Sequence, residues 1–194
     1  MYQSLYEHIN HYVGLTEEQF QYCQTFFRYK RMRKRQYILQ EGQVQASSFF
    51  ILNGLVRMYE IDDRGGEHIF QFHHETEWVL PIASLDDEVP ASYNLDCLED
   101  TEVLILNNAA KVDLINSLPI MGCYFYLQLQ ESYTHLVRRV SSHLSKPTAE
   151  RYNEFVEQHR LLEQRVPNHW IASYLGVTPQ SLSRIRAQNR LAIH

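Results

Sequence analysis

The sequence has 194 residues, with 18 Lys and Arg against 23 Asp and Glu, so the formal net charge is −5. A hydrophobic content of 44% and a charged content of 21% are typical of a globular chain and exclude a disordered one. The apolar runs are only a few residues long, which excludes a membrane-spanning helix. The first residues have neither the basic nor the apolar region of a secretory signal, so we expect a cytoplasmic protein.

The charge is divided unevenly along the chain. Residues 1–137 carry 9 Lys and Arg against 19 Asp and Glu, a net charge of −10, whereas residues 138–194 carry 9 against 4, a net charge of +5. An acidic front joined to a basic tail indicates two modules with different partners. Chance clustering of charges on solvated helix faces is the alternative interpretation.

The three cysteines, Cys23, Cys97 and Cys123, are far apart and form no CxxC pair. This spacing argues against a zinc or iron–sulfur site. We expect three buried, free thiols.

The first part of the chain is predicted to be helical over residues 1–28, with Thr16 capping a second helix. A basic run from Arg28 to Arg35 follows. Such a run can mark a nucleic-acid-binding patch, but the β-rich residues after it favour a strand with exposed Lys and Arg.

Residues 37–106 show short β-rich runs separated by turn signals. Asn53-Gly54 predicts a two-residue hairpin turn, in which both residues need a positive φ. Asp62 to Gly66 predicts the next turn, and an irregular stretch lies between Pro81 and Pro90. About six short antiparallel strands at this spacing indicate a small sandwich or roll.

The chain from residue 108 onward is predicted to be helical. A short helix covers 111–117 and a long one covers 120–144, before Ser145-Lys146-Pro147 breaks the helix and Thr148 caps the next one. Apolar residues in the long helix recur at alternating steps of four and three, which is a heptad seam. The seam consists of Gly122, Tyr126, Leu129, Tyr133, Leu136, Val140 and His143.

This seam predicts a coiled-coil dimer, with packing of the helix on its own β-domain as the alternative. We assign Tyr126, Leu129, Tyr133, Leu136 and Val140 to the dimer interface.

The segment from Asn168 to Arg186 has the spacing of a helix-turn-helix. Ala172 is small where two helices would cross, and Gly176, four residues later, suits the positive φ of a tight turn. Thr178 can cap the second helix, and Pro179 fits its first turn. An ordinary helical hairpin would not explain the polar side chains on the second helix. The expected shared core consists of Ile171, Leu175, Val177, Leu182 and Ile185.

The second helix, residues 179–189, is expected to lie in the major groove of double-stranded DNA. Its candidate base-reading residues are Gln180, Ser181 and Arg184, because Gln can pair with adenine and Arg with guanine. The candidate phosphate contacts are Thr178, Ser183, Arg186 and Arg190, which would position the protein without reading sequence.

An acidic β-roll, a long heptad helix, a break and a C-terminal helix-turn-helix together resemble the Crp/Fnr family of bacterial transcription regulators, in particular its short Bacteroidetes members. The resemblance implies an α+β fold: a jelly-roll-like antiparallel β-roll with flanking helices and an all-α reading domain. The implied domains are a cyclic-nucleotide-binding-like sensor with N-terminal helices at 1–117, a dimerisation helix at 118–145 and a DNA-binding domain at 146–194. The resemblance also implies a homodimer that reads a two-fold DNA site and recruits or blocks RNA polymerase.

The sensor pocket departs from the pattern of the cyclic-AMP binders. Leu80-Pro81 stands where that pattern has Gly-Glu for the ribose, and Ala91 stands where it has the phosphate-binding Arg, so that only Ser92 matches. Leu136 and Val137 stand where it has adenine-binding hydroxyl residues. Because a buried phosphate needs a paired cation, we expect no cyclic AMP. We assign no cofactor, and the effector, if the protein has one, is unknown. The alternatives for the pocket are an apolar or neutral ligand, or filling by side chains such as Trp78 and Tyr93.

Two further features bear on function. His73 and His74 lie near Glu75 and Glu77, but adjacent strand residues point to opposite faces, so we interpret the histidines as exposed polar residues and not as a metal site. Only eight residues follow Arg186, too few for the β-hairpin wing that usually follows the recognition helix. The chain shows no nucleophile–base pair or phosphate loop, so we expect no enzyme. The alternatives are a cupin-like enzyme or metal-binding protein, and a β-roll that binds a small molecule and uses its helical tail only for dimerisation.

Overall fold

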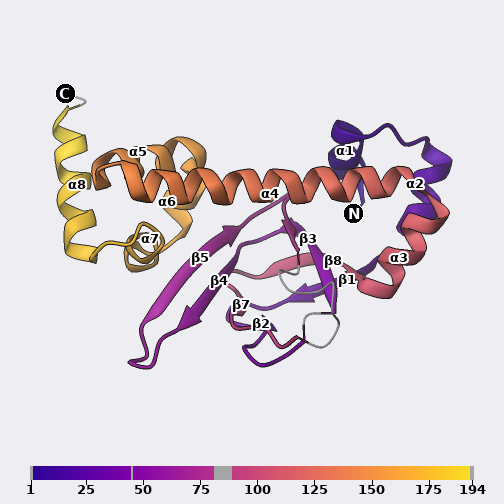
Figure 1. The fold of residues 1–194 in the computed structure, drawn as a ribbon, viewed down its shortest axis with the longest axis horizontal. Coiled ribbons are helices and arrows are strands. Elements are labelled where there is room, and N and C mark those ends of the chain that lie inside the picture. Colours follow the sequence, from indigo (N-terminus) through magenta and orange to yellow (C-terminus); the bar gives the residue numbers. More distant parts are fainter. Residues whose placement is uncertain (1, 45, 81–88, 193–194) are drawn as a thin grey trace. The chain divides into compact units, whose positions relative to one another are not determined.

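The computed structural model describes residues 2–44, 46–80 and 89–192, with side chains described up to residue 188 (Figure 1). The chain divides into two compact units. The first unit comprises Met1–Glu60 and Phe72–Ser132, and the second comprises Ile61–Gln71 and Tyr133–His194. The boundaries at residues 60/61 and 71/72 fall within one β-hairpin, and the boundary at 132/133 falls within one long helix. This hairpin and this helix therefore each contribute residues to both units.

Two short helices open the first unit: α1 (Gln3–Tyr12) and α2 (Glu17–Gln24). The Thr16 hydroxyl accepts a hydrogen bond from the Gln19 backbone N–H at 3.2 Å, and the Gln19 side chain accepts one from the Thr16 N–H at 3.0 Å. This reciprocal pair satisfies two N–H groups that the first turn of a helix leaves without partners. The predicted cap at Thr16 is confirmed.

The β-roll consists of two four-stranded sheets (Figure 1). The first has the order β1 (Arg28–Met32), β8 (Thr101–Asn107), β3 (Ser47–Asn53) and β6 (Trp78–Val79). The second has the order β2 (Tyr37–Leu39), β7 (Asn94–Cys97), β4 (Val56–Ile61) and β5 (Glu67–His73). The predicted roll is confirmed, although the two-residue strand β6 was not anticipated.

The predicted hairpin turn at Asn53-Gly54 is wrong. Strand β3 pairs with β6 and β8 in the first sheet, whereas β4 belongs to the second sheet, so these two residues carry the chain between sheets. Only Gly54 has a positive φ, +107°. A Cβ at this position would lie 2.5 Å from the Thr101 hydroxyl and 2.8 Å from the Asp100 carbonyl. The glycine therefore serves a close backbone approach as well as a turn.

The hairpin of the roll is β4–β5, joined by the predicted turn from Asp62 to Gly66. The Asp62 N–H donates to the Gly66 carbonyl at 2.9 Å, and the Asp62 carboxylate accepts from the backbone N–H groups of Arg64 and Gly66 at 2.8 Å each. An aspartate that bonds to its own turn in this way is a common device for fixing a loop.

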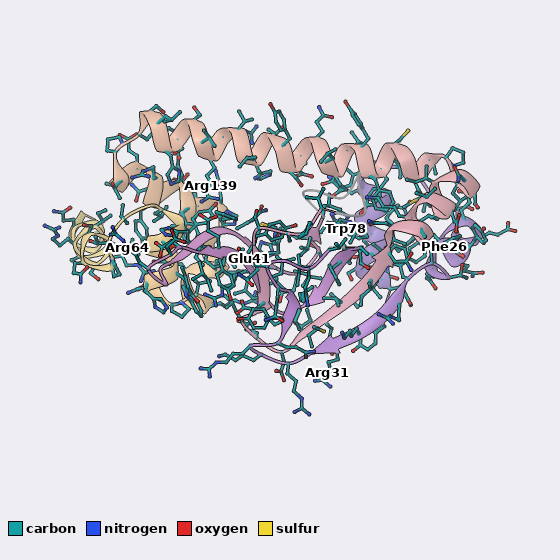
Figure 2. All side chains as sticks on the ribbon, turned by 60° about the horizontal axis from the view of Figure 1, so that its bottom comes forward. Phe26, Arg31, Glu41, Arg64, Trp78 and Arg139 are labelled. Carbon is teal, nitrogen blue, oxygen red and sulfur yellow. The ribbon has the colours of Figure 1, made fainter. Side chains whose placement is uncertain are left out.

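The basic run from Arg28 to Arg35 forms the edge strand β1 and the turn that follows it, and all of its Lys and Arg side chains are exposed. Figure 2 shows Arg31 projecting away from the sheet. The prediction of a strand with exposed cations is confirmed. Cations on an edge strand also discourage pairing with the edge of another molecule.

The core of the first unit lies where the N-terminal helices meet the first sheet and the start of the long helix. At its centre the Trp78 indole N–H donates to the Tyr124 hydroxyl at 2.7 Å, and the same hydroxyl lies 2.7 Å from His8 Nδ1. Three elements are thereby joined at one oxygen, and Trp78 belongs to this core. Its buried apolar members include Leu5, Ile9, Phe20, Cys23, Phe50, Leu104, Leu106, Leu114, Met121 and Phe125.

Two further helices follow the roll: α3 (Asn108–Ser117) and the long α4 (Ile120–Ser145). The face of α4 that contains Met121, Tyr124, Phe125 and Gln128 is buried in the first unit. The predicted long helix is confirmed, and the break after Ser145 separates it from the next helix.

The remaining helices are α5 (Thr148–Gln158), α6 (Arg160–Arg165), α7 (Asn168–Tyr174) and α8 (Pro179–Ala192). The predicted cap at Thr148 is wrong, because Pro147 occupies the cap position and Thr148 begins the helix. Helix α6 was not predicted. None of the helices in the described part of the chain combines the length and apolar character that a membrane crossing requires.

Two predictions about burial are also corrected. Cys23 and Cys97 are buried, but Cys123 is exposed on α4, since it lies away from the face that meets the core. His73 is buried, and this burial lowers its pKa to about 4, because a charged imidazole would lose its hydration. The residue is therefore not an exposed side chain at a strand end. Its neighbour His74 is half-buried.

Two glycines with positive φ, Gly54 between the sheets and Gly65 in the β4–β5 turn, allow a test of the close backbone approach at Gly54. We expect Gly54→Ala to lower the free energy of unfolding by about 1–3 kcal/mol through overpacking, in addition to the cost of a positive φ. Gly65→Ala is the matched control, because Gly65 has a φ of +80° with nothing within 4 Å of the added Cβ. Urea unfolding of both variants measures the difference, and equal losses would contradict a special role for crowding at Gly54.

Candidate nucleic-acid interface

The second unit contains a helix-turn-helix formed by α7, a tight turn and α8. Gly176 has a φ of +65°, which only glycine adopts without strain. Its N–H donates to the Ser173 carbonyl at 3.0 Å, and the Val177 N–H donates to the Ala172 carbonyl at 2.9 Å. These bonds satisfy carbonyls at the end of α7 and hold the turn.

The two helices share the predicted core. Ala172 is fully buried, as expected for a small residue where helices cross closely. Ile171, Leu175 and Leu182 are also buried, and Val177 and Ile185 are half-buried. The predicted packing is confirmed at Ile171, Ala172, Leu175 and Leu182. It is partial at Val177 and Ile185.

The start of α8 is fixed by the residues that the sequence indicated. The Ser181 N–H donates to the Thr178 hydroxyl at 3.2 Å, which is an N-cap. Pro179 is the first residue of the helix, where its missing N–H has no consequence. The Thr178 hydroxyl also lies 3.0 Å from the Ser181 hydroxyl. The N-terminal end of α8 is thus well defined.

One face of α8 is exposed and polar. Gln180, Ser183 and Arg184 are exposed, whereas Leu182 between them is fully buried. Ser181 is half-buried, and its hydroxyl accepts from the Arg184 guanidinium at 3.4 Å. An amide and a guanidinium one turn apart on an exposed helix are the groups that bind base edges bidentately.

Arg186, predicted to contact phosphate, forms an ion pair and hydrogen bonds within the second unit. Its guanidinium lies 3.1 Å from the Glu163 carboxylate, donates to the Tyr152 hydroxyl at 3.0 Å and also donates to Asn168. Burial and donation to Glu163 raise the pKa of Tyr152. Helical spacing places Arg186 four residues after the buried Leu182, on the inner face of α8. These contacts give Arg186 a role in packing α8 onto α5, α6 and α7.

Of the other predicted phosphate contacts, the structure describes the side chains of Thr178 and Ser183. Thr178 and Ser183 are exposed near the start of α8, and the Ser183 hydroxyl donates to the Pro179 carbonyl at 2.9 Å. Arg190 lies in α8, but its side chain is outside the described part.

The predicted dimer residues form an exposed apolar stripe along α4. Tyr126, Leu129, Tyr133, Leu136 and Val140 are between 50% and 66% exposed. They lie on a different face of the helix from Met121, Tyr124, Phe125 and Gln128, which are buried. Packing on the β-domain and an exposed seam are therefore both present, on different faces of one helix.

The predicted sensor-pocket residues are only partly described. Leu80 is half-buried, Ala91 is buried and Ser92 is exposed. Pro81 lies outside the described residues.

Sequence reasoning missed a buried ion pair in the roll. Arg57 on β4 donates to both carboxylate oxygens of its cross-strand partner Asp96 on β7, at 2.7 and 3.0 Å. The guanidinium also lies 3.9 Å from the centre of the Tyr59 ring. A single Arg within the apolar run Leu55 to Tyr59 was the available signal. This buried cation is already neutralised by Asp96, so an anionic ligand would have to compete with that carboxylate.

Within residues 2–44, 46–80 and 89–192, no group of three or more His, Cys, Asp and Glu side chains is arranged to hold a metal ion. The pair His73 and His74 shares one carboxylate, with His74 Nε2 3.3 Å and His73 Nδ1 4.0 Å from Glu77.

Comparison with known proteins agrees with this architecture. Residues 29–117 match the family model of the cyclic nucleotide-binding domain. FixK2 from Bradyrhizobium japonicum is similar in structure, with a TM-score of 0.73 and 17% identity over 86% of this chain and 85% of that chain. The chain has the Crp/Fnr fold.

Other proteins of the Crp/Fnr fold are equally distant in sequence. A CooA variant from Carboxydothermus hydrogenoformans has a TM-score of 0.71 and 16% identity over 96% of this chain and 84% of that one. The c-di-GMP-responsive global regulator CLP from Xanthomonas campestris has a TM-score of 0.69 and 14% identity over 91% of this chain and 93% of that one. No curated protein is significantly similar in sequence. At these identities the structural likeness establishes the fold.

Two arginines on α8 allow a test of the internal role of Arg186. We expect Arg186→Ala to lower the free energy of unfolding by about 1–3 kcal/mol, because it removes the guanidinium that pairs with Glu163 and donates to Tyr152 and Asn168. Arg184→Ala, two residues away and exposed, should change it by less than about 0.5 kcal/mol. Urea unfolding followed by far-UV circular dichroism measures both, and equal effects would contradict the assignment.

Proposed function

We propose that the protein is a DNA-binding transcription regulator of the cytoplasm that acts as a homodimer and has no enzymatic activity. The observation that carries this proposal is the exposed polar face of α8, presented by a closely packed helix-turn-helix in a chain of the Crp/Fnr fold. The polar side chains are at the N-terminal end of α8, which is the end that reaches base edges when such a helix enters the major groove.

Within this proposal, Gln180, Ser181 and Arg184 read bases, while Thr178, Ser183 and Arg190 contact phosphates. Arg186 is excluded because its guanidinium is held by Glu163 and Tyr152. Phosphate contacts set register and base contacts set sequence preference. The bound protein then recruits or blocks RNA polymerase.

The proposed dimer uses the exposed stripe of α4. The stripe places an apolar residue at five consecutive a and d positions, from Tyr126 to Val140, and this is the pattern of a two-stranded coiled coil. Large apolar side chains exposed as a continuous stripe mark an interaction surface in a soluble chain. A second copy of the same helix fits this stripe, because a two-fold interface pairs a surface with itself.

The proposed sensor does not use cyclic AMP as its effector. Leu80 and Ala91 are apolar at two positions where the family pattern binds ribose and phosphate. The buried cation of the roll, Arg57, is engaged with Asp96. CLP, which has the same fold, is described as responsive to c-di-GMP.

Base reading by Arg184 is testable by substitution. We expect Arg184→Ala to weaken binding to the selected DNA site by about 1–3 kcal/mol and to relax the preference at one base pair. Gln188→Ala is the control, because Gln188 is exposed on α8 but lies outside the proposed contact set. Fluorescence anisotropy with specific and random duplexes measures both variants. An equal loss on the two duplexes would show that Arg184 does not read a base.

The dimer seam is tested separately. We expect Leu136→Glu to convert the protein to a monomer, because two carboxylates would meet in an apolar seam. Ser141→Glu, on the same helix but off the seam, should leave two chains per particle. Light scattering measures the mass, and a dimeric Leu136→Glu protein would show that the seam is placed wrongly.

A further inference from the structure

The tip of the β4–β5 hairpin packs against the first helix of the helix-turn-helix. Residues 61–71 belong to the second unit together with the end of α4 and helices α5–α8. Strand β5 is at the edge of its sheet and has a neighbouring strand on one side only. Its outer backbone groups therefore need partners from elsewhere.

Ser173 on α7 supplies two of these partnerships. Its hydroxyl donates to the Glu67 carbonyl at 2.8 Å and accepts from the Ile69 N–H at 3.0 Å. One side chain thus substitutes for a pairing strand at two consecutive outward-facing residues of β5. Ser173 is the last but one residue of α7, and its hydroxyl bonds to the backbone of β5.

Arg139, near the end of α4, also donates to the backbone of β5. Its guanidinium donates to the carbonyls of Ile69 and Phe70 and, at 3.3 Å, to the carbonyl of Tyr174 on α7. It also lies 4.2 Å from the centre of the Tyr174 ring. The arginine joins three elements at one group: α4, α7 and β5.

A third contact closes the arrangement at the hairpin tip. The Trp170 indole N–H donates to the Glu67 carboxylate at 2.7 Å. Trp170, Ser173 and Tyr174 lie at helical spacing on one face of α7, whereas Ile171, Ala172 and Leu175 on the other side are buried. We name the contacts made by Glu67, Ile69, Phe70, Arg139, Trp170, Ser173 and Tyr174 the hairpin latch.

The hairpin latch leaves the proposed reading face open. Each of its contacts is on α7, α4 or β5, and Gln180 and Arg184 remain exposed on α8 while the latch is closed. The latched arrangement is therefore compatible with DNA binding. It fixes α7, and through the α7–α8 core it fixes the direction of the reading helix relative to the end of α4.

We propose that the hairpin latch is a positioning device that sets the half-site spacing read by the dimer. The inference rests on the proposed function. A dimer that reads a two-fold site must present two α8 helices about one helical turn of DNA apart. Reading helices held rigidly at one separation bind sites of one spacing tightly, whereas loosely held helices lose orientational entropy on binding and accept several spacings.

Ser173→Ala tests the latch with little risk to folding, because alanine favours helix and Ser173 is outside the α7–α8 core. Trp170→Phe is the second variant and removes only the indole donor to Glu67. Ser141→Ala, on exposed α4 outside the latch, is the control. In hydrogen exchange, we expect the Ile69 amide to exchange at least about 10-fold faster in Ser173→Ala, with the Leu182 amide of α8 unchanged.

The DNA readout separates positioning from general damage. On a duplex with one half-site, we expect the variants and the wild-type protein to bind equally. On the preferred two-fold site, the variants should bind about 5-fold more weakly, and the penalty for changing the spacing by one or two base pairs should be smaller than in the wild-type protein. A loss of stability alone would reduce binding to both duplexes and leave the spacing preference intact.

Two results would overturn the proposal. Unchanged exchange at Ile69 in Ser173→Ala would show that the latch is not closed in solution. Accelerated exchange with an unchanged spacing preference would show that the latch does not position the reading helices. Failure of the proposed function is a distinct outcome, because the wild-type protein itself would then show no preference for a two-fold site.

Discussion

The structure depends on one constraint: helix α4 has to present different chemistry on each of its faces and at each of its ends. Near its start, Met121, Tyr124 and Phe125 are buried in the core of the first unit. Along another face runs the exposed stripe from Tyr126 to Val140. Near its end, Arg139 holds the hairpin tip and α7. A helix can meet these demands because residues three or four apart share a face while their neighbours point elsewhere.

The net charge of −5 does not describe the local charge in this chain. Residues 138–194 carry a net charge of +5, but several of their cations form ion pairs or hydrogen bonds inside the second unit. Arg139 and Arg151 bind backbone carbonyls, Arg186 pairs with Glu163 and Lys146 pairs with Glu154. The exposed Arg184 is different, because its contact is a long one to Ser181 on its own helix. What matters for a nucleic-acid partner is therefore which cations are exposed together with hydrogen-bonding side chains, and α8 provides them.

The sequence predicted those features that local rules determine. The capping box at Thr16, the turn at Gly176 and the start of α8 at Thr178 each depend on residues within a few positions of one another. The long helix followed from its apolar periodicity. The Asn53-Gly54 interpretation failed because a hairpin signal describes a turn and not the sheet that the next strand joins. Here the deciding contact is with Thr101, almost fifty residues later.

The contacts within the candidate site were hard to predict for a similar reason. Arg186 looked like a phosphate contact because it is basic and near the reading residues, yet its four-residue spacing from Leu182 already indicated the inner face of α8. The roles of Arg57 and Arg139 depend on partners brought together by the fold, Asp96 in one case and the edge of β5 in the other. Single-sequence patterns show which residues share an element, but they do not show which elements meet.

In the proposed function α8 reads DNA as one of two copies in a dimer, and in vitro selection of DNA sites is the direct test. Purified full-length protein would be incubated with a duplex library of random sequence at moderate salt, and the retained duplexes would be sequenced. We expect enrichment of an inverted repeat whose half-sites are centred about one helical turn, or 10–10.5 base pairs, apart. Retention of duplexes without any enriched sequence, or enrichment of a single unrepeated motif, would contradict it.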